Sequence, residues 1–160
     1  MLKIGQRIPP AYLASLSAEG AVLRECTERM FAGVKAIIVG VPGAFTPVCT
    51  HEHLPQFITA AARLRASGFQ RIVCVATSDP YSLDAWARVI DPQRELAYYS
   101  DGNLAFARAC GLLRSEEDLF LGARSQRYVL TIEDAIVMRM RVEESVLAVS
   151  CTRPQDIVSL

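Results

Sequence analysis

A chain of 160 residues, 51% of them hydrophobic, is long enough to bury the core of one compact domain. Its formal net charge of zero argues against a nucleic acid or an anionic membrane held by bulk electrostatics. No apolar run is long enough to cross a bilayer and the N-terminal residues lack the apolar core of a secretory signal, so we expect a cytoplasmic protein.

Five short apolar runs, taken in chain order, predict β-strands. They are residues 36–41, 71–76, 97–99, 128–132 and 136–140. The first two runs are almost continuously apolar, which is typical of strands buried on both faces of a sheet. The last two are separated by Glu133-Asp134-Ala135, a short polar turn that predicts a hairpin.

Helical patterns alternate with these strands, at residues 47–67, 81–90 and 103–110 and in a short segment from Pro154. Gly68 is placed to end the first helix, whereas Pro55 lies inside that helix and should kink or break it. The alternation predicts a mixed, mostly parallel central sheet with helices on both faces. The order fits a single thioredoxin-like α/β sandwich over residues 1–160. A flavodoxin-like sheet is the alternative, but it would not need the closing hairpin.

The segment after the first strand holds the most informative residues. Thr46 followed by Pro47 is a helix-start signal, with Thr as the N-cap and Pro at the first helical position. Cys49 is therefore expected in the first helical turn. The positive end of the helix dipole there favours a thiolate, which is the nucleophilic form of cysteine.

Two other interpretations of Cys49 have to be weighed. An isolated cysteine is most often a buried, inert thiol. The position of Cys49 between a strand and a helix argues against that interpretation. A metal site built from Cys49, His51 and His53 is disfavoured, because helical residues two apart point about 200° away from each other. We therefore predict no metal site and no bound cofactor.

The spacing Pro42-x-x-x-Thr46-x-x-Cys49 resembles the active-site motif of the peroxiredoxins. The longer run from Gly40 to Pro47, with His53-Leu54-Pro55, is similar to the type-5 or type II (atypical two-cysteine) group. The similarity covers nearly the whole chain and extends through Ser78-Asp79-Pro80, Trp86, Asp101-Gly102-Asn103, Phe106, Arg127-Tyr128 and the C-terminal tail.

This resemblance implies a thiol-dependent peroxidase that reduces hydrogen peroxide and alkyl hydroperoxides through a sulfenic acid at Cys49. It implies that the Thr46 hydroxyl contacts the sulfur and the peroxide, and that Pro42 shields the pocket from water. The family's arginine corresponds to Arg127, whose guanidinium would stabilise the thiolate and donate to the peroxide. Arg124 is the nearby alternative.

A second thiol must resolve the sulfenic acid, and the resemblance offers three candidates. Cys151 aligns with the resolving cysteine of animal type-5 enzymes, Cys74 with the position that plant type II enzymes use, and glutathione or glutaredoxin is the external route. We prefer Cys151, because a terminal segment unwinds more cheaply than a central strand. Thioredoxin or glutaredoxin would then restore the dithiol, and Cys26 and Cys110 are expected to be structural.

The resemblance also implies a homodimer formed through the face around the active site, and a hairpin and linker over residues 18–33. His53 is expected to pack or to form hydrogen bonds rather than to act as a base. Two other function classes remain open: a redox sensor that passes the oxidation of Cys49 to a partner protein, and a non-catalytic interaction module.

Overall fold

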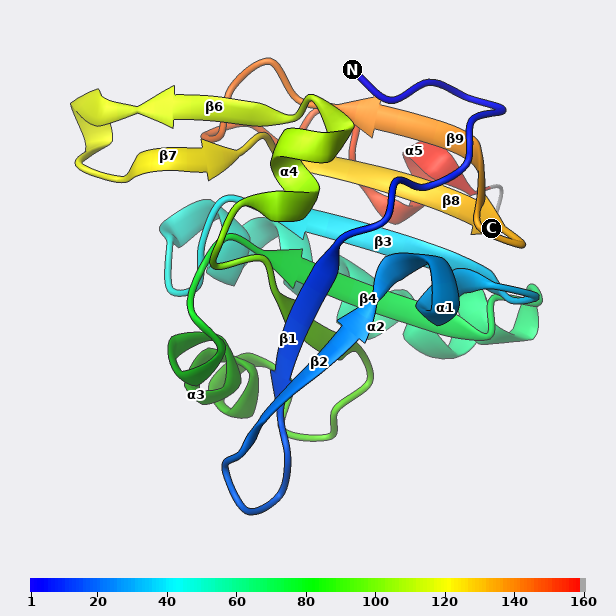
Figure 1. Cartoon of the computed structure of the whole chain (residues 1–160), viewed down its shortest axis with the longest axis horizontal. Helices are drawn as coiled ribbons and strands as arrows, with labels where there is room; N and C mark the ends of the chain where they lie inside the picture. Colours follow the sequence, from blue (N-terminus) through cyan, green and yellow to red (C-terminus); the bar gives the residue numbers. More distant parts are fainter. Residues whose placement is uncertain (159–160) are drawn as a thin grey trace.

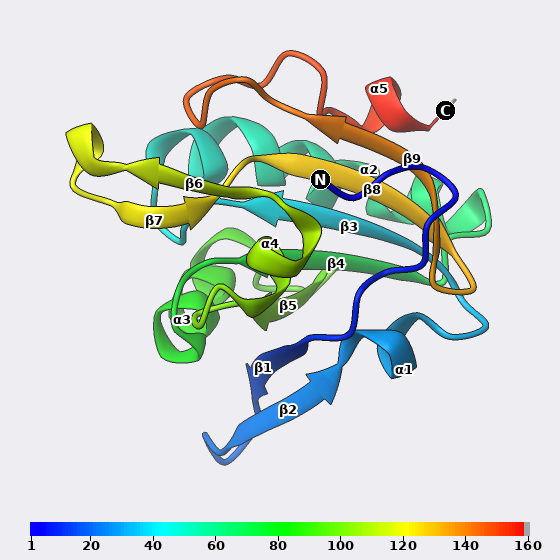
Figure 2. The ribbon, with the colours of Figure 1, turned by 45° about the horizontal axis from the view of Figure 1, so that its top comes forward.

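The computed structural model describes residues 1–158, in which a seven-stranded sheet carries helices on both faces (Figure 1, Figure 2). The strands are β1 (Tyr12–Leu16), β2 (Val22–Cys26), β3 (Lys35–Val41), β4 (Arg71–Ala76), β5 (Ala97–Ser100), β6 (Leu113–Glu116), β7 (Gly122–Ser125), β8 (Tyr128–Glu133) and β9 (Ile136–Val142). The helices are α1 (Thr27–Phe31), the π-helical turn η1 (Cys49–His53), α2 (Leu54–Ala66), α3 (Pro80–Ile90), α4 (Ala105–Cys110), the 3-10 turn η2 (Glu117–Leu119) and α5 (Pro154–Ile157).

All five predicted strands and all four predicted helical segments are present, with ends that differ by a few residues. Gly68 follows the end of α2 with a φ of +96°, as expected of a glycine at a helix C-terminus. The N-terminal hairpin begins earlier than expected, at β1, and is followed by the short helix α1. Neither α1 nor the β6–β7 hairpin was expected from the sequence. The hairpin projects from the main sheet as a separate arm (Figure 1).

The sheet is mixed, with the strand order β2-β1-β5-β4-β3-β8-β9. It is less parallel than expected, because only β3–β4 and β4–β5 pair in parallel. The other pairings, β1–β2, β1–β5, β3–β8 and β8–β9, are antiparallel. The reason is that a hairpin extends the three-stranded parallel centre at each edge, and a hairpin necessarily brings antiparallel strands.

Two apolar layers, one on each face of the sheet, confirm the thioredoxin-like α/β sandwich. One layer joins β3 and β4 to α2, α3 and α5, with Phe57 and Trp86 fully buried. The other joins the opposite sheet face to α1 and α4, with Phe31 and Phe106 fully buried. Figure 1 shows α4 in front of the sheet and α2 behind it. Within residues 1–158, no helix combines the length and apolar character needed to cross a membrane.

The antiparallel pairing of β3 with β8 brings two distant parts of the sequence together. Gly40, near the end of β3, lies opposite Tyr128, the first residue of β8. A Cβ atom on Gly40 would fall 2.0 Å from the Tyr128 ring, so only glycine allows this approach. The loop that leaves β3 toward Cys49 therefore lies beside Arg127, which immediately precedes β8.

Candidate active site

Cys49 lies in the first turn of the helical segment that follows β3. Pro47 is the first residue of that segment with helical backbone. The carbonyl of Thr46 accepts the N–H of Thr50 at 3.0 Å, as the carbonyl of an N-cap residue does. The Cys49 side chain is 0% exposed. The structure thus puts a buried sulfur where the helix dipole favours negative charge.

The helix that carries Cys49 begins with a π turn, because Pro55 has no N–H to donate. Within η1 the N–H of Leu54 donates to the carbonyl of Cys49, five residues earlier, and regular α-helix follows. The proline therefore neither breaks nor ends the helix, because the wider π turn accommodates Pro55 within the helix. The indole of the buried Trp86 donates to the Thr50 hydroxyl at 3.1 Å and fixes this turn to α3.

A buried guanidinium contacts the Cys49 sulfur. Arg127 is 0% exposed, and its Nη1 donates to Cys49 Sγ at 3.3 Å. Its Nη2 donates to the carbonyl of Val146 at 2.6 Å, and its Nε has no hydrogen-bond partner among the described residues. No carboxylate of residues 1–158 forms a salt bridge with Arg127. The sulfur of Cys49 is thus in position to act as the counter-ion of this cation.

His53 orients Arg127 from the other side. Its Nε2 lies 2.9 Å from the carbonyl of Thr152, which can only accept, so the proton of the ring is on Nε2. Its Nδ1 then accepts from Arg127 Nη1 at 3.1 Å. Burial, followed by the positive charge of Arg127, lowers the pKa of His53 from 6.5 to about 4. His53 is therefore a neutral hydrogen-bonding residue, packed edge-on against Phe57 with ring centroids 5.6 Å apart.

Pro42 and Thr46 lie in the loop between β3 and the helix. Pro42 is buried, and its carbonyl accepts from the Thr77 hydroxyl at 2.7 Å. The Thr46 hydroxyl donates to the carbonyl of Gly43 at 2.9 Å. That bond tightens the loop, and it leaves the lone pairs of the hydroxyl oxygen available to accept. The structure brings Cys49 and Arg127 into direct contact, with Thr46 three residues before the sulfur.

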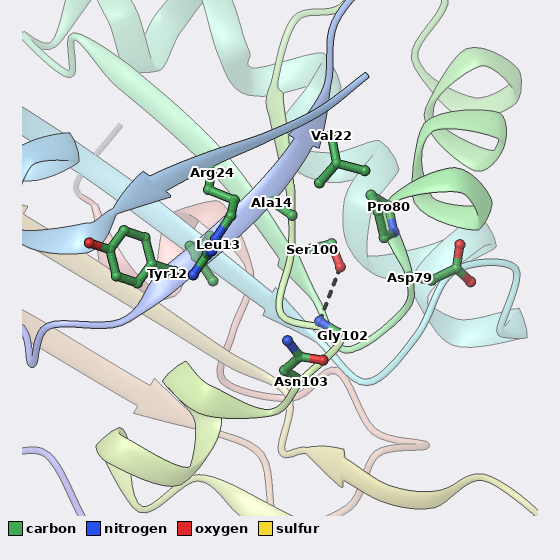
Figure 3. A pocket seen from close by; sticks show the side chains of 10 residues that line it. All are labelled: Tyr12, Leu13, Ala14, Val22, Arg24, Asp79, Pro80, Ser100, Gly102 and Asn103. Atoms are coloured by element: carbon green, nitrogen blue, oxygen red, sulfur yellow. Dashed lines mark hydrogen bonds between the residues drawn. The ribbon is translucent and has the colours of Figure 1, made fainter. Parts of the chain in front are cut away.

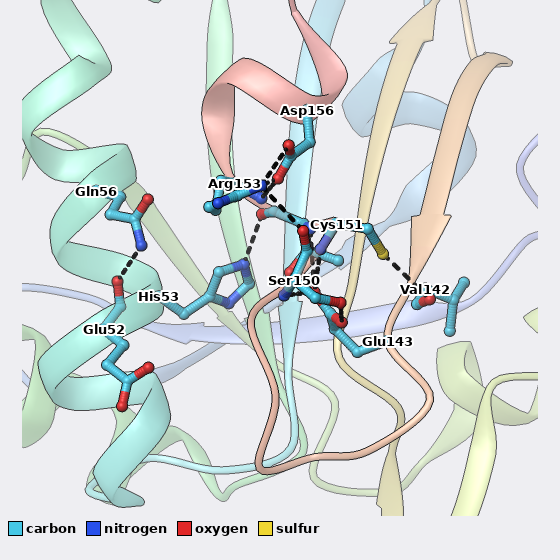
Figure 4. Close-up of polar contacts among 10 residues, drawn as sticks. Glu52, His53, Gln56, Val142, Glu143, Ser150, Cys151, Arg153 and Asp156 are labelled. Atoms are coloured by element: carbon cyan, nitrogen blue, oxygen red, sulfur yellow. Dashed lines mark hydrogen bonds and ion pairs between the residues drawn. The ribbon is translucent and has the colours of Figure 1, made fainter.

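The other cysteines are free thiols in quite different surroundings. Cys74 is fully buried in β4, the central strand of the sheet, and burial, followed by the charge of Cys49, raises its pKa well above the ordinary value. Burial also raises the pKa of Cys110 to about 12. Cys151 is half-buried in a loop, where its thiol faces the carbonyl of Val142 at 3.5 Å (Figure 4).

Glu143, which directly follows β9, was not predicted from the sequence. This carboxylate is 2% exposed and accepts hydrogen bonds from the segment that carries Cys151 (Figure 4). Burial alone would raise its pKa, but the N–H of Cys151 and the groups of Ser150 and Thr152 outweigh burial and lower it from 4.5 to about 2. A Glu-Glu pair directly after a strand carries no local signal of such a role.

Of two surface hollows, the first lies beside the predicted site residues and the second does not. One, of about 450 Å³, is lined by Phe45, Thr77, Ser78 and Arg124 and flanks the loop before Cys49. Arg124 is tied there by its Nε to the carbonyl of Leu121 at 2.8 Å. The other, of about 480 Å³, lies between the β1–β2 hairpin and the start of α3 and contains none of the predicted site residues (Figure 3). His51 is exposed whereas Cys49 and His53 are buried, so these three residues do not converge on one point.

A comparison with protein families matches residues 3–150 to the Redoxin family. A relative from Oryza sativa subsp. japonica, Peroxiredoxin-2C, is 32% identical over 88% of this chain and 87% of its own length. The chain belongs to the peroxiredoxins, within the Redoxin family. Peroxiredoxins are thiol-dependent peroxidases.

Further relatives support this assignment. The chloroplastic Peroxiredoxin-2E-2 of Oryza sativa subsp. japonica is 36% identical over 89% of this chain, which spans only 65% of that protein's length. Among solved structures, the reduced Prx3 of Vibrio vulnificus in complex with H2O2 matches with a TM-score of 0.91 and 33% identity. That match covers 98% of this chain and 96% of the other, so the peroxiredoxin fold extends over the whole described structure.

The pKa of His53 makes the stability of this peroxiredoxin depend on pH. Between pH 6.5 and about 4 the unfolded chain takes up a proton at His53 and the folded chain does not. The free energy of unfolding should therefore fall by roughly 3 kcal/mol as the pH falls through this window. The lowered pKa of Glu143 acts below this window, as the pH falls from 4.5 to about 2.

Urea unfolding at a series of pH values tests this with a matched pair of variants. His53→Gln keeps a donor and an acceptor but has no titrating group, so it should flatten the pH dependence between pH 6.5 and 4. His51→Gln changes the exposed histidine and should retain the wild-type slope. An unchanged slope in His53→Gln would contradict the neutral, buried assignment of His53.

Proposed function

We propose that this chain reduces hydrogen peroxide and alkyl hydroperoxides with a thiolate at Cys49. The observation that carries the proposal is the contact of 3.3 Å between Arg127 Nη1 and Cys49 Sγ, both fully buried. A buried cation is strongly unfavourable unless an anion compensates it. Since no carboxylate of residues 1–158 pairs with Arg127, the thiolate of Cys49 is the compensating anion.

The surroundings of Cys49 suit a peroxide substrate. The unpaired, buried Nε of Arg127 is a donor for a peroxide oxygen, because an unsatisfied buried donor gains most from a partner. The Thr46 hydroxyl is the proposed second contact, and the buried Pro42 keeps water from the sulfur. Support also comes from the similar Vibrio vulnificus Prx3, whose structure was solved in complex with H2O2.

The chemistry follows from a single displacement. The Cys49 thiolate attacks one oxygen of the peroxide, the O–O bond breaks, and an S–O bond forms to give the sulfenic acid. The other oxygen leaves with the electron pair and takes up a proton to become water or an alcohol. The guanidinium stabilises the negative charge that develops on this leaving oxygen.

Cys151 is the proposed resolving thiol. Attack by its sulfur on the sulfenic acid forms the Cys49–Cys151 disulfide and releases water. Cys151 lies in a loop after β9, whereas Cys74 lies in the central strand, where movement would break hydrogen bonds on both sides. Burial, followed by the charge of Glu143, also raises the pKa of Cys151. Cys74 is the more deeply buried thiol, with its pKa raised well above the ordinary value, so it is the poorer nucleophile of the two.

An external dithiol or thiol must complete the cycle. Thioredoxin or glutaredoxin is the proposed reductant of the disulfide, and glutathione is the alternative if no internal disulfide forms. Five free cysteines suit a reducing compartment, which supports the cytoplasmic location.

Mass mapping after one equivalent of hydrogen peroxide, under non-reducing conditions, tests the two cysteine assignments together. We predict a Cys49–Cys151 disulfide in the wild type and a persistent sulfenic acid at Cys49 in Cys151→Ser. Cys49→Ser should lose peroxidase turnover altogether, because no other cysteine of residues 1–158 accepts a hydrogen bond from a guanidinium. Cys74→Ser is the matched control and should form the wild-type disulfide.

Two outcomes would reject parts of this assignment. A Cys49–Cys74 disulfide, or a persistent sulfenic acid or glutathione adduct in the wild type, would remove Cys151 as the resolving thiol. Peroxidase turnover in Cys49→Ser would remove Cys49 as the reacting thiol.

A homodimer formed through the face around the active site is the proposed assembly. Phe45 in the loop before Cys49 is 56% exposed, and Phe120 at the tip of the β6–β7 arm is 98% exposed. Leu119, beside it, is 42% exposed. Exposed aromatic side chains of this kind are typical of protein interfaces. The hollow beside Phe45 reaches Ala123 of β7, which supports one continuous surface between loop and arm.

Sedimentation analysis of the reduced protein tests this surface. Phe120→Glu should shift a dimer to monomer, because it brings a charge into an apolar contact. Val89→Glu is the matched control, since Val89 is 70% exposed on α3 but does not line the hollow beside Phe45, and it should leave the dimer intact. A monomeric wild type, or a Phe120→Glu dimer as strong as that of the wild type, would contradict the proposal.

A further inference from the structure

A carboxylate clasp holds the segment after β9 in place. Glu143 Oε1 accepts three consecutive backbone N–H groups, from Ser150 at 2.7 Å, Cys151 at 2.8 Å and Thr152 at 3.0 Å. It also accepts the Thr152 hydroxyl at 2.8 Å, and Oε2 accepts the Ser150 hydroxyl at 2.7 Å (Figure 4). No salt bridge within residues 1–158 involves Glu143, so these hydrogen-bond donors are its direct partners.

The clasped segment is connected to the Cys49 sulfur by consecutive hydrogen bonds. The carbonyl of Thr152 accepts from His53 Nε2 at 2.9 Å, and this bond fixes the tautomer that leaves Nδ1 as an acceptor. Nδ1 accepts from Arg127 Nη1 at 3.1 Å. The same Nη1 donates to Cys49 Sγ at 3.3 Å.

Glu143 is also tied to Arg127 through the backbone. The N–H of Glu143 donates to the carbonyl of Arg127 at 2.9 Å, which continues the β8–β9 pairing beyond Tyr128 and Val142. The carboxylate that holds residues 150–152 is therefore built next to the guanidinium that His53 orients. A shift of the segment would move the Thr152 carbonyl, and with it the acceptor on which the orientation of His53 depends.

We propose that Glu143 is a positioning residue of the thiolate site. Its carboxylate holds residues 150–152 so that the Thr152 carbonyl fixes His53, and His53 fixes Arg127 against the Cys49 sulfur. This inference rests on the function proposed above for Cys49. It adds a residue about ninety positions from Cys49 in sequence that never touches the sulfur or the substrate.

Two variants separate the reach of the side chain from its charge. Glu143→Asp keeps the charge but is one methylene shorter, so it cannot hold the three N–H groups in the same place. Glu143→Gln keeps the length and one acceptor oxygen but removes the charge. Glu144→Asp and Glu144→Gln, at the exposed neighbouring position, are the matched controls.

The first measurement is the rate constant of prereduced protein with hydrogen peroxide. We expect Glu143→Asp to react about 10- to 100-fold more slowly, the size of effect that a small misplacement of catalytic groups produces. Glu143→Gln should stay close to the wild type, and both Glu144 variants should match it. A wild-type rate in a folded Glu143→Asp protein would overturn the proposal.

The second measurement is the thiolate content of Cys49, from ultraviolet absorbance as the pH is varied. A merely electrostatic effect of Glu143 would predict more thiolate in Glu143→Gln and no change in Glu143→Asp, because a nearby negative charge disfavours a thiolate. Positioning predicts the reverse, with less thiolate at neutral pH in Glu143→Asp alone. The electrostatic pattern would rule positioning out.

A double-mutant cycle tests the route through His53. If Glu143 acts through His53, the double variant Glu143→Asp, His53→Ala should react no more slowly than His53→Ala alone. If the two fold reductions multiply, Glu143 acts independently and the proposal fails. The Cys49→Ser protein separates this failure from a failure of the proposed function. Peroxidase turnover in Cys49→Ser would reject the proposed function, whereas an inactive Cys49→Ser together with multiplying fold reductions would reject only the role of Glu143.

Discussion

A buried guanidinium that lacks a carboxylate partner is the constraint on which the site depends. Arg127 is fully buried, and within the described structure it meets a carbonyl, an imidazole and a thiol but no acidic side chain. An arrangement of this kind is tolerable only if one of those partners carries negative charge. The sulfur of Cys49, at the start of a helix, is the group best able to do so. In the proposed function, this contact stabilises the reactive form of the cysteine before any substrate arrives.

The sheet creates this contact, and the loop after β9 maintains it. Antiparallel pairing of β3 with β8, through the close approach at Gly40, brings Cys49 and Arg127 together across 78 residues of sequence. The segment 150–152 then holds His53 against Arg127. In the proposed cycle the same segment also carries the resolving thiol. The contacts that order the site for the peroxide must therefore open before Cys151 can reach the sulfenic acid.

The central strands, the longer helices and the position of Cys49 at a helix start could be predicted from sequence because their signals are local: apolar runs, turn residues and the Thr46-Pro47 pair. Arg127 was identified only through its resemblance to a family, since burial of one arginine among many depends on tertiary packing. The π turn was missed because Pro55 predicts a disturbance of the helix but not its form. Glu143 was missed because its partners are backbone N–H groups seven to nine residues away. Both hairpins were expected, but the antiparallel pairing of β1 with β5 and of β3 with β8 was not, because the neighbour of a strand is decided by tertiary packing.

The most direct test of the central claim is the thiolate absorbance of Cys49 as a function of pH in Arg127→Met, with Arg124→Met as the matched control. The Cys49→Ser protein supplies the baseline to be subtracted. We predict equal thiolate absorbance at neutral pH in the wild type and in Arg124→Met. In Arg127→Met this absorbance should be lower, because the sulfur has lost the cation that contacts it. Equal thiolate content at neutral pH in Arg127→Met and the wild type would contradict the account, because the buried guanidinium would then not be what holds the charge on Cys49.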